Sequence, residues 1–547
     1  MPNFSAALNP ATPSRLLRWE AGPRPAALSS EDLAQTAAEV RESVHVLRDP
    51  AHGGLGLGLG GRAMPAESLR SGDVEVVASL PPLYPEWLGN RGFCERHGLR
   101  FPYLAGAMAN GIASVELVIA IAGIGGMGFF GAAGLSLGRV ESAVQTLKST
   151  LGDARPWGVN LIHSPAEPTH EAAVADLLIR YGVRCVEASA YMALTAPIVR
   201  YAVSGLRERA DGSIERRHRV VGKISREEVA RHFLLPAPAK LLAELLARGE
   251  ITAEEARLAE RVPVATDITC EADSGGHTDN RPLTALLPSI LLLRDRIAAE
   301  RGYAEPIHVG AAGGLGTPSS LAAAFALGAD FVQTGSVNQG CVESGLHASG
   351  RAKLAQVGMA DVTMAPAADM FEMGVEVQVL KRGSLFAPRA RKLYDLYRSH
   401  ASLEAIPASE REKVEQTMLR ASFDEAWVST RSFWMSRDPA QVERAERDGK
   451  HRMALVFRAY LGLSSRWAID GVAERDSDYQ IWCGPAMGAF NRWVEGSFLE
   501  SADQRHAGQV ALNLLEGAAV VSRAQQLRCY GLPIPPACFD FRPRPLA

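Results

Sequence analysis

The sequence predicts an α/β fold built around a (β/α)8 barrel, and three observations lead to this prediction. Short β-rich runs alternate with helix-period segments from Phe101 onward. Eight such runs fall within about 240 residues, which matches the size of one (β/α)8 barrel. Small or polar residues follow most of the runs, whereas a doubly wound sheet more often has fewer strands and one glycine-rich turn. The expected strands are 101–105, 128–132, 157–162, 184–188, 219–224, 264–271, 307–311 and 331–334, and helices are expected at 114–122, 140–151, 171–181, 192–203, 283–301 and 319–328.

Three domains are expected along the chain: a small N-terminal β-containing lobe (1–95), the barrel (96–345) with a helical insertion (232–262), and a mainly helical C-terminal region (346–547). The insertion lies between the fifth and sixth strands, and we expect it on the face whose loops build the site, with Thr252 as a helix N-cap.

Local patterns fill in the two flanking domains. In the N-terminal lobe, the alternating run 73–79 predicts a strand. The glycine-rich run 52–62 predicts a surface loop, because no strand precedes it and no phosphate-loop lysine follows it. In the C-terminal region, 375–386 predicts a strand pair.

Composition excludes several classes of protein. The net charge is −3, so nothing global indicates nucleic acid or an anionic membrane as a partner. The seven cysteines are widely spaced without a CxxC pair, which predicts reduced thiols in a cytoplasmic protein and neither a disulfide framework nor a zinc site. Residues 1–20 contain no apolar core of signal-peptide length. The uncharged segment 117–138 is too rich in glycine for a membrane span, and predicts a helix followed by a buried strand.

The stretch 266–283, TDITCEADSGGHTDNRPL, carries the strongest chemical signal. A β-branched run leads into two carboxylates, Gly-Gly-His at 275–277, and then an apolar helix. Glycines let a ligand approach the backbone closely, and a histidine titrates near neutral pH. This order predicts a site at the carboxyl end of a barrel strand. We expect Glu271 to point into the barrel and Asp273 to order the turn.

Two further glycine turns end the seventh and eighth expected strands. Gly313 and Gly314 follow strand seven, and strand eight ends in Gln333, Thr334, Gly335 and Ser336. Glycine N–H groups on these adjacent strands, with a helix N-terminus beside them, are where barrels commonly hold a phosphate. Tight turns alone would explain one glycine pair but not two.

Small residues at 106–111 and 131–134 predict room for a flat ring system. Asn160 ends strand three, Glu187 lies near the end of strand four, and Lys223 closes strand five. A buried lysine is usually paired or bound to a ligand, because an isolated buried ammonium is costly. Together with the phosphate turns and the histidine, these features predict a flavin mononucleotide (FMN) site. Hydrolysis is unsupported, since no Ser-His-Asp motif is present.

Several long motifs resemble the PfaD-type trans-acting enoyl reductases of polyunsaturated fatty acid and polyketide synthases. They are PYLAGAMANGIAS, EADSGGHTDNRPL, GAAGGLGTPSS, QTGSVNQ, YLGLSSRWA and DYQIWCGPAMGAFN, and the resemblance runs over about 80–515. That family is similar in turn to nitronate monooxygenases and flavin-dependent enoyl-carrier-protein reductases, which are FMN-binding barrels.

The resemblance implies that NADPH or NADH reduces FMN, which then reduces a trans-2-enoyl thioester on an acyl carrier protein at its β-carbon. It implies that His277 either polarises the thioester carbonyl or protonates the α-carbon. The residues implied to bind the cofactor are Ala107, Met108, Asn160, Lys223, Gly275, Gly276, Gly313, Gly314, Gln333, Gly335 and Ser336.

One departure from the family bears on the alternatives. Shorter relatives continue Gly-Gly-His with a small residue and a glycine, whereas this chain has Thr-Asp-Asn-Arg at 278–281. The more polar mouth argues against a nitronate monooxygenase-type oxidase, which is the alternative activity. A non-catalytic carrier-docking component is the alternative of another class. The C-terminal helical region is a candidate surface for a homodimer or for docking a synthase.

Overall fold

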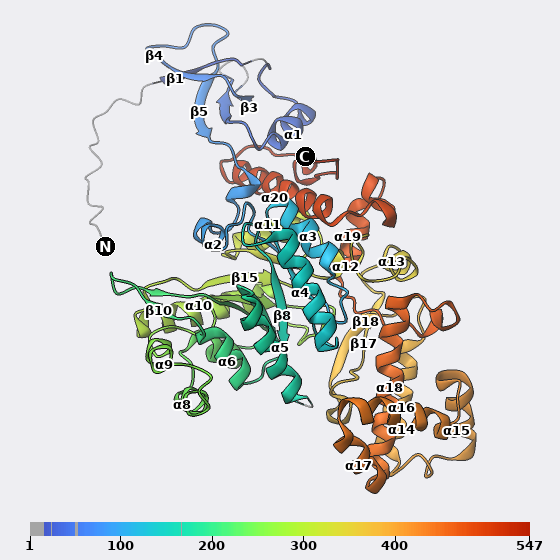
Figure 1. Ribbon diagram of the computed structural model, residues 1–547. Helices are drawn as coiled ribbons and strands as arrows, with labels where there is room; N and C mark the ends of the chain where they lie inside the picture. The colour runs from blue at the N-terminus through green and yellow to red at the C-terminus, as the bar shows by residue number, and fades with distance from the viewer. Residues whose placement is uncertain (1–15, 23, 50–52, 166) are drawn as a thin grey trace. The chain divides into compact units, whose positions relative to one another are not determined.

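The computed structural model describes residues 16–22, 24–49, 53–165 and 167–547, which cluster into two compact units (Figure 1). One unit joins the described part of Met1–Trp87 to Leu515–Arg542, and the other joins Leu88–Leu514 to Pro543–Ala547. Residues 1–15, which carry most of the segment tested for a signal peptide, lie outside the described residues.

The first unit is built on a five-stranded antiparallel sheet with the order β3-β2-β5-β1-β4. The strand expected at 73–79 is present as β5. Helix α1 begins after the N-cap Ser29, whose hydroxyl accepts a hydrogen bond from the Asp32 amide. The elements are β1 (Leu16–Glu20), α1 (Ser30–Ala38), β2 (Val44–Arg48), β3 (Leu55–Leu59), β4 (Arg62–Ala66) and β5 (Glu75–Leu80).

The surface loop expected at 52–62 is wrong over most of that run, while His52 lies outside the described residues. Leu55–Leu59 is the strand β3 and is largely buried. A Cβ atom on Gly58 would lie 2.6 Å from the Trp19 ring, so this glycine allows the strand to pack against the indole. The alternation of leucine with glycine was the overlooked strand signal, because glycine here serves close packing and not flexibility.

The second unit contains a closed barrel of eight parallel strands in the order β12-β13-β15-β16-β6-β7-β8-β9. The predicted (β/α)8 fold and all eight expected strands are therefore confirmed. The strands are β6 (Tyr103–Ala105), β7 (Met127–Phe130), β8 (Gly158–Ile162), β9 (Cys185–Ser189), β12 (Arg219–Ile224), β13 (Asp267–Glu271), β15 (His308–Ala312) and β16 (Val332–Thr334).

The expected barrel helices are also present, and the helix at 283–301 agrees at both ends. The uncharged segment 117–138 contains a helix followed by a buried strand, as predicted, and its last two residues already belong to the next helix. Within the part of the chain that the structure describes, no helix has the length and apolar character needed to cross a membrane. The helices are α3 (Val115–Ile124), α4 (Leu137–Leu151), α5 (Pro168–Tyr181), α6 (Ala196–Val203), α7 (Glu227–Leu234), α10 (Leu283–Arg301) and α11 (Pro318–Ala326).

The helical insertion forms α8 (Ala239–Ala247) and α9 (Ala253–Ala259), but on the opposite face from the one expected. The regular barrel helix α7 follows β12 directly, so α8 and α9 belong to the connection that returns to the amino end of β13. Arg257 and Arg261 of this segment pair with Glu208, which belongs to the connection returning from α6 to β12. The expected N-cap is present, because Thr252 forms a capping box at α9.

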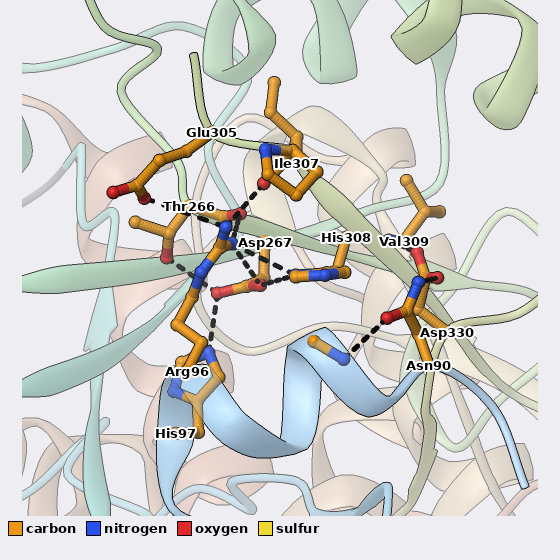
Figure 2. Close-up of polar contacts among 12 residues, drawn as sticks. Asn90, Arg96, His97, Thr266, Asp267, Glu305, Ile307, His308, Val309 and Asp330 are labelled. Carbon is orange, nitrogen blue, oxygen red and sulfur yellow. Dashed lines mark hydrogen bonds and ion pairs between the residues drawn. The ribbon is translucent and has the colours of Figure 1, made fainter. Parts of the chain in front are cut away.

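A buried polar network lies at the amino end of the barrel next to helix α2 (Arg91–His97; Figure 2). The carboxylate of Asp267, fully buried at the start of β13, lies 2.9 Å from Nε2 of His97, 3.2 Å from Nδ1 of His308 and 3.4 Å from Nη1 of Arg96. The Thr266 hydroxyl donates a fourth contact at 2.7 Å. Burial opposes the charged form, but these neighbours outweigh it and hold the pKa of Asp267 below its ordinary value.

Two strands of the C-terminal region form a three-stranded sheet, β14-β18-β17, with a short strand of the barrel domain. The strands are β14 (Gly276–His277), β17 (Val362–Pro366) and β18 (Glu376–Leu380). The strand pair expected within 375–386 is thus wrong: that run supplies β18 alone, and its partners come from two other segments. The region is otherwise helical, as predicted. Its main helices are α13 (Ala348–Leu354), α14 (Phe386–Ser399), α15 (Ala408–Val414), α16 (Phe423–Arg437), α17 (Pro439–Arg447), α18 (Gly449–Asp470), α19 (Ala486–Val494) and α20 (Ala507–Cys529).

Candidate active site at the carboxyl end of the barrel

Glu187 on β9 is the centre of a polar network inside the barrel. Its side chain is fully buried. One carboxylate oxygen accepts the backbone N–H of Ala107 at 3.1 Å, and the other accepts Nε2 of Gln333 at 2.5 Å. The Gln333 carbonyl in turn accepts the hydroxyl of Thr269 at 2.9 Å. Side chains of β9, β13 and β16 and the turn after β6 are thereby fixed to one another.

Asn160 on β8 extends this network without reaching the Glu187 carboxylate. Its Nδ2 donates to the backbone carbonyl of Glu187 and to the hydroxyl of Ser189, both at 3.0 Å. The Asn160 side chain is buried, so its amide is held in one orientation.

Lys223, a partly buried residue near the end of β12, is paired, as predicted. Its Nζ lies 3.3 Å from Oε1 of Glu271, which also accepts the Ser274 hydroxyl at 3.2 Å. Burial by itself lowers the pKa of Lys223, but the charges of Glu271 and Glu187 raise it above its ordinary value. Burial raises the pKa of Glu187. The site therefore combines an ammonium group with two acidic side chains.

The Gly-Gly-His turn is held by residues from the C-terminal region. A Cβ atom on Gly275 would lie 2.8 Å from the backbone nitrogen of Cys483, so only glycine fits there without a shift. The side-chain nitrogen of Gln378 on β18 donates to Asp273 at 2.8 Å and to the Ser274 carbonyl at 2.7 Å. Asp273 also accepts the Asn280 amide at 2.9 Å, and thus orders the turn as expected.

His277 lies at the rim, and its side chain is 40% exposed. Its Nε2 is 3.3 Å from Oδ1 of Asp369, which follows β17. Burial by itself lowers the pKa of His277, but the hydrogen bond and charge of Asp369 raise it above its ordinary value. The same contact lowers the pKa of Asp369 against the opposing effect of burial.

The two glycine turns predicted to hold a phosphate lie side by side, because β15 and β16 are paired. Gly313 has φ +81°, and its Cβ would come 2.6 Å from the backbone carbonyl carbon of Ala272. A Cβ on Gly314 or Gly335 would instead meet no atom within 4 Å, so both turns border open space. The Ser336 hydroxyl accepts the Gly484 N–H at 3.2 Å.

Two of the small residues expected to leave room for a ring are filled by the protein itself. A Cβ on Gly106 would lie 2.4 Å from Nε2 of Gln333, and a Cβ on Gly131 would lie 1.7 Å from the Met108 carbonyl oxygen. These glycines bring backbone and side chains together, and do not themselves border an open ring site. Ala107 and Met108 are half-buried in the same turn.

Sequence reasoning underrated Glu187 and missed Asp369 and Gln378. A lone carboxylate inside the apolar strand CVEAS was the available signal for Glu187. Asp369 and Gln378 come from a distant segment with no local motif, so nothing in the sequence tied them to the turn at 275–277.

A family model described as nitronate monooxygenase matches residues 93–424, and one described as the inserted helical domain of [acyl-carrier-protein] S-malonyltransferase matches residues 400–479. One of the subunits of the polyunsaturated fatty acid synthase of Thraustochytrium sp. is 44% identical over 524 residues, which are 93% of this chain and 34% of that protein. Polyketide biosynthesis protein PksE of Bacillus subtilis is 42% identical over 445 residues, which are 81% of this chain and 58% of that protein. The chain thus spans only part of the length of these relatives.

Among solved structures, the enoyl reductase domain of MlnA, from the macrolactin biosynthesis cluster of Bacillus amyloliquefaciens, matches with a TM-score of 0.78 and 38% identity. The match covers 81% of this chain and 99% of that domain. The closed barrel of eight parallel strands defines the class as a TIM-barrel protein. The chain belongs to the nitronate monooxygenase family, a family of oxidoreductases, and is a PfaD-like member of it.

Proposed function

We propose that the chain is an enoyl reductase that uses FMN and NAD(P)H. Its substrate would be a trans-2-enoyl thioester carried by an acyl carrier protein of a polyunsaturated fatty acid or polyketide synthase, on which it would act in trans. The observation that carries the proposal is 38% identity to a solved enoyl reductase domain over nearly the whole of that domain. The paired His277 and the Glu187–Lys223–Glu271 group at the carboxyl end of this chain's barrel fit such a reaction.

The residues at this end suit a flavin mononucleotide. The open space beside Gly314 and Gly335, on adjacent strands, would admit a phosphate to backbone N–H groups, with Gly313 and Ser336 in the same turns. Ala107, Met108, Asn160, Lys223 and Gln333 would face the ring system, and Gly275 and Gly276 would border it. When bound, FMN supplies hydride transfer between NAD(P)H and the enoyl β-carbon.

The chain's own residues would divide the remaining tasks. The Lys223 ammonium, held charged by Glu271 and Glu187, would stabilise negative charge on a ligand beside it. The network through Glu187, Gln333 and Thr269 would keep these groups in place. His277, whose raised pKa favours the imidazolium, would hold a proton at the rim for the thioester carbonyl or the α-carbon.

The partner is part of the same proposal. Both relatives described above are named as synthase or polyketide biosynthesis proteins, and residues 400–479 match the inserted helical domain of [acyl-carrier-protein] S-malonyltransferase. We expect a cytoplasmic homodimer, and light scattering of the purified protein would check the dimer.

The deciding experiment is anaerobic turnover of a crotonyl thioester, loaded on a separately purified carrier protein, with NADPH or NADH. We expect a flavin that is released as FMN on denaturation, and saturation of the double bond without oxygen. A chain that purifies without flavin and leaves the thioester unchanged would instead support a non-catalytic carrier-docking component.

Nitronate oxidation is the second candidate, because the family model itself is that of nitronate monooxygenases. Asp279, in the polar stretch after His277, is bound by Arg226 at 2.6 Å and by Ser225 at 2.5 Å. This ion pair keeps the stretch after His277 polar, and that polarity argues against nitronate oxidation. Oxygen consumption with a propionate nitronate, with no anaerobic enoyl reduction, would favour the oxidase over our proposal.

A further inference from the structure

The C-terminal region supplies the immediate surroundings of the Gly-Gly-His turn. Strand β14 is only two residues long and pairs with β18, so that Gly276 lies opposite Gln378 and His277 opposite Val377. Strand β18 pairs in turn with β17, whose last residue is Pro366. The chain then continues into the loop that carries Asp369.

This loop is fixed at both sides of Asp369. Arg458 of α18 donates through Nε to the Ala368 carbonyl at 2.8 Å, and its Nη1 lies 3.2 Å from a carboxylate oxygen of Glu372. The next element, the 3-10 helix Phe371–Met373, packs the fully buried Phe371 into the core of the helical region. Asp369 is therefore presented to His277 by an anchored loop.

We propose that Asp369 is a positioning residue for His277: its carboxylate pairs with the imidazole at Nε2 and fixes the orientation of the ring. The two atoms are 3.3 Å apart, and the side chains come from separate elements that the β14-β18-β17 sheet holds together. The inference deepens the proposed function and rests on it for the use of that proton. It also gives the C-terminal region a chemical task, because the region completes the site.

The other charges near His277 do not replace Asp369. Lys223 on β12 acts on His277 with the opposite sign and lowers its pKa, whereas Glu271 on β13 raises it. These two groups are paired with each other at 3.3 Å, so their effects on a third group largely cancel. On the other side of the pair, Arg458 lowers the pKa of Asp369 and keeps it charged.

The test measures the protonation of His277 directly. Of the two forms of a histidine ring, diethyl pyrocarbonate modifies the neutral one and not the protonated one. His277 is accessible to the reagent, because its side chain is partly exposed. The full-length protein, as purified, is treated over a range of pH, and modification of the His277 peptide is quantified by mass spectrometry. For Asp369→Asn we expect the midpoint to move to lower pH by about half a pH unit, the scale of a partly exposed ion pair. Asp369→Glu, which keeps the charge, should retain most of the wild-type midpoint.

Activity provides the second readout. If protonated His277 serves enoyl reduction, kcat/KM falls as the pH rises and the ring loses its proton. In Asp369→Asn this fall should begin at a lower pH than in the wild type, by the same amount as the shift of the modification midpoint. NADPH-driven flavin reduction should stay within twofold of wild type. Asp395→Asn removes an exposed carboxylate on α14 and should change neither measurement.

An unshifted His277 midpoint in Asp369→Asn overturns the inference, whatever the activity. A shifted midpoint in a protein that reduces no enoyl thioester leaves the pair intact and refutes the proposed function instead. Loss of folding in Asp369→Asn would be visible in circular dichroism. Asp369→Ser, which also removes the charge, would then carry the test, and the same shift of the His277 midpoint to lower pH is expected.

Discussion

At the scale of single residues, His277 is the side chain whose loss should separate proton transfer from flavin binding. It lies at the rim and pairs with Asp369, whereas the turns expected to hold the phosphate, 313–314 and 335–336, follow two other strands of the barrel. We expect His277→Ala to retain FMN and to lower the rate of enoyl reduction by about 10²-fold or more, the scale of a lost acid or base.

The flavin content follows from the absorbance spectrum, and the rate from NADPH consumption with enoyl thioester. His506→Ala is the matched control, because His506 is also exposed and contacts a carboxylate, Glu343, at 3.0 Å. Turnover of His277→Ala equal to that of the control would remove His277 from the reaction.

Glu187 carries a different kind of prediction, one of stability. Both of its carboxylate oxygens accept N–H donors in a fully buried position. In Glu187→Gln, one donor would face the new NH2 group, so a buried donor loses its acceptor at a cost of about 1–3 kcal/mol in the free energy of unfolding. Urea unfolding measures this change. Glu300→Gln, an exposed substitution on α10, should be near neutral, and equal unfolding midpoints for the two variants would contradict the network.

At the scale of elements, the turns after β15 and β16 make the phosphate prediction testable. Gly314 has φ +70° and borders open space. We expect Gly314→Asp to abolish flavin binding, because it places charge and bulk where the phosphate would lie. Gly212→Asp is a matched control: Gly212 also has a positive φ and open space, but lies in the hairpin at the other end of the barrel. Flavin retained by Gly314→Asp would refute the phosphate assignment.

The elements also explain where sequence reasoning succeeded and failed. Barrel strands and helices are set by local hydrophobic patterns, which is why the strand run before Glu271 and the helix at 283–301 were predictable. Glycine is ambiguous by the same reasoning, since it serves turns, close packing and ligand approach alike. Gly58 was therefore assigned to a loop, and Gly131 to an open ring site, although both make room for atoms of the protein.

At the scale of the whole molecule, the pairing of residues and strands that lie far apart in the chain could not be predicted from the sequence. The partner of His277 is Asp369, and the partner of β14 is β18, both of them about a hundred residues downstream in a region without a local motif. The insertion was placed on the wrong face for a related reason. The periodicity of the sequence identified the two helices of the insertion, α8 and α9, but not the regular barrel helix α7 that precedes them. Because α7 already leads back from the carboxyl end of the barrel, the helices that follow it lie toward the amino end.

The closure of the barrel at its amino end leads to the last prediction. The Asp267 carboxylate contacts His97 and Arg96 of α2 and His308 of β15. In addition, Phe93 of α2 stacks on Phe331 with ring centroids 4.2 Å apart. Replacing the carboxylate leaves these cationic or polar groups buried without their acceptor. We expect Asp267→Asn to lower the free energy of unfolding at pH 7 by about 3 kcal/mol, the scale for breaking a buried pair.

The sign of the pH dependence follows from the lowered pKa of Asp267 in the folded chain. Its stabilisation is complete above the unfolded pKa of about 3.9, and is lost as pH falls below that value, because protons then bind the unfolded carboxylate first. Urea unfolding of wild type and Asp267→Asn should therefore differ most near neutral pH and converge at acidic pH. Asp153→Asn, which removes an exposed partner of Arg184, is the control and should stay close to wild type. If the two variants unfold alike at pH 7, the network at the amino end does not stabilise the barrel as argued.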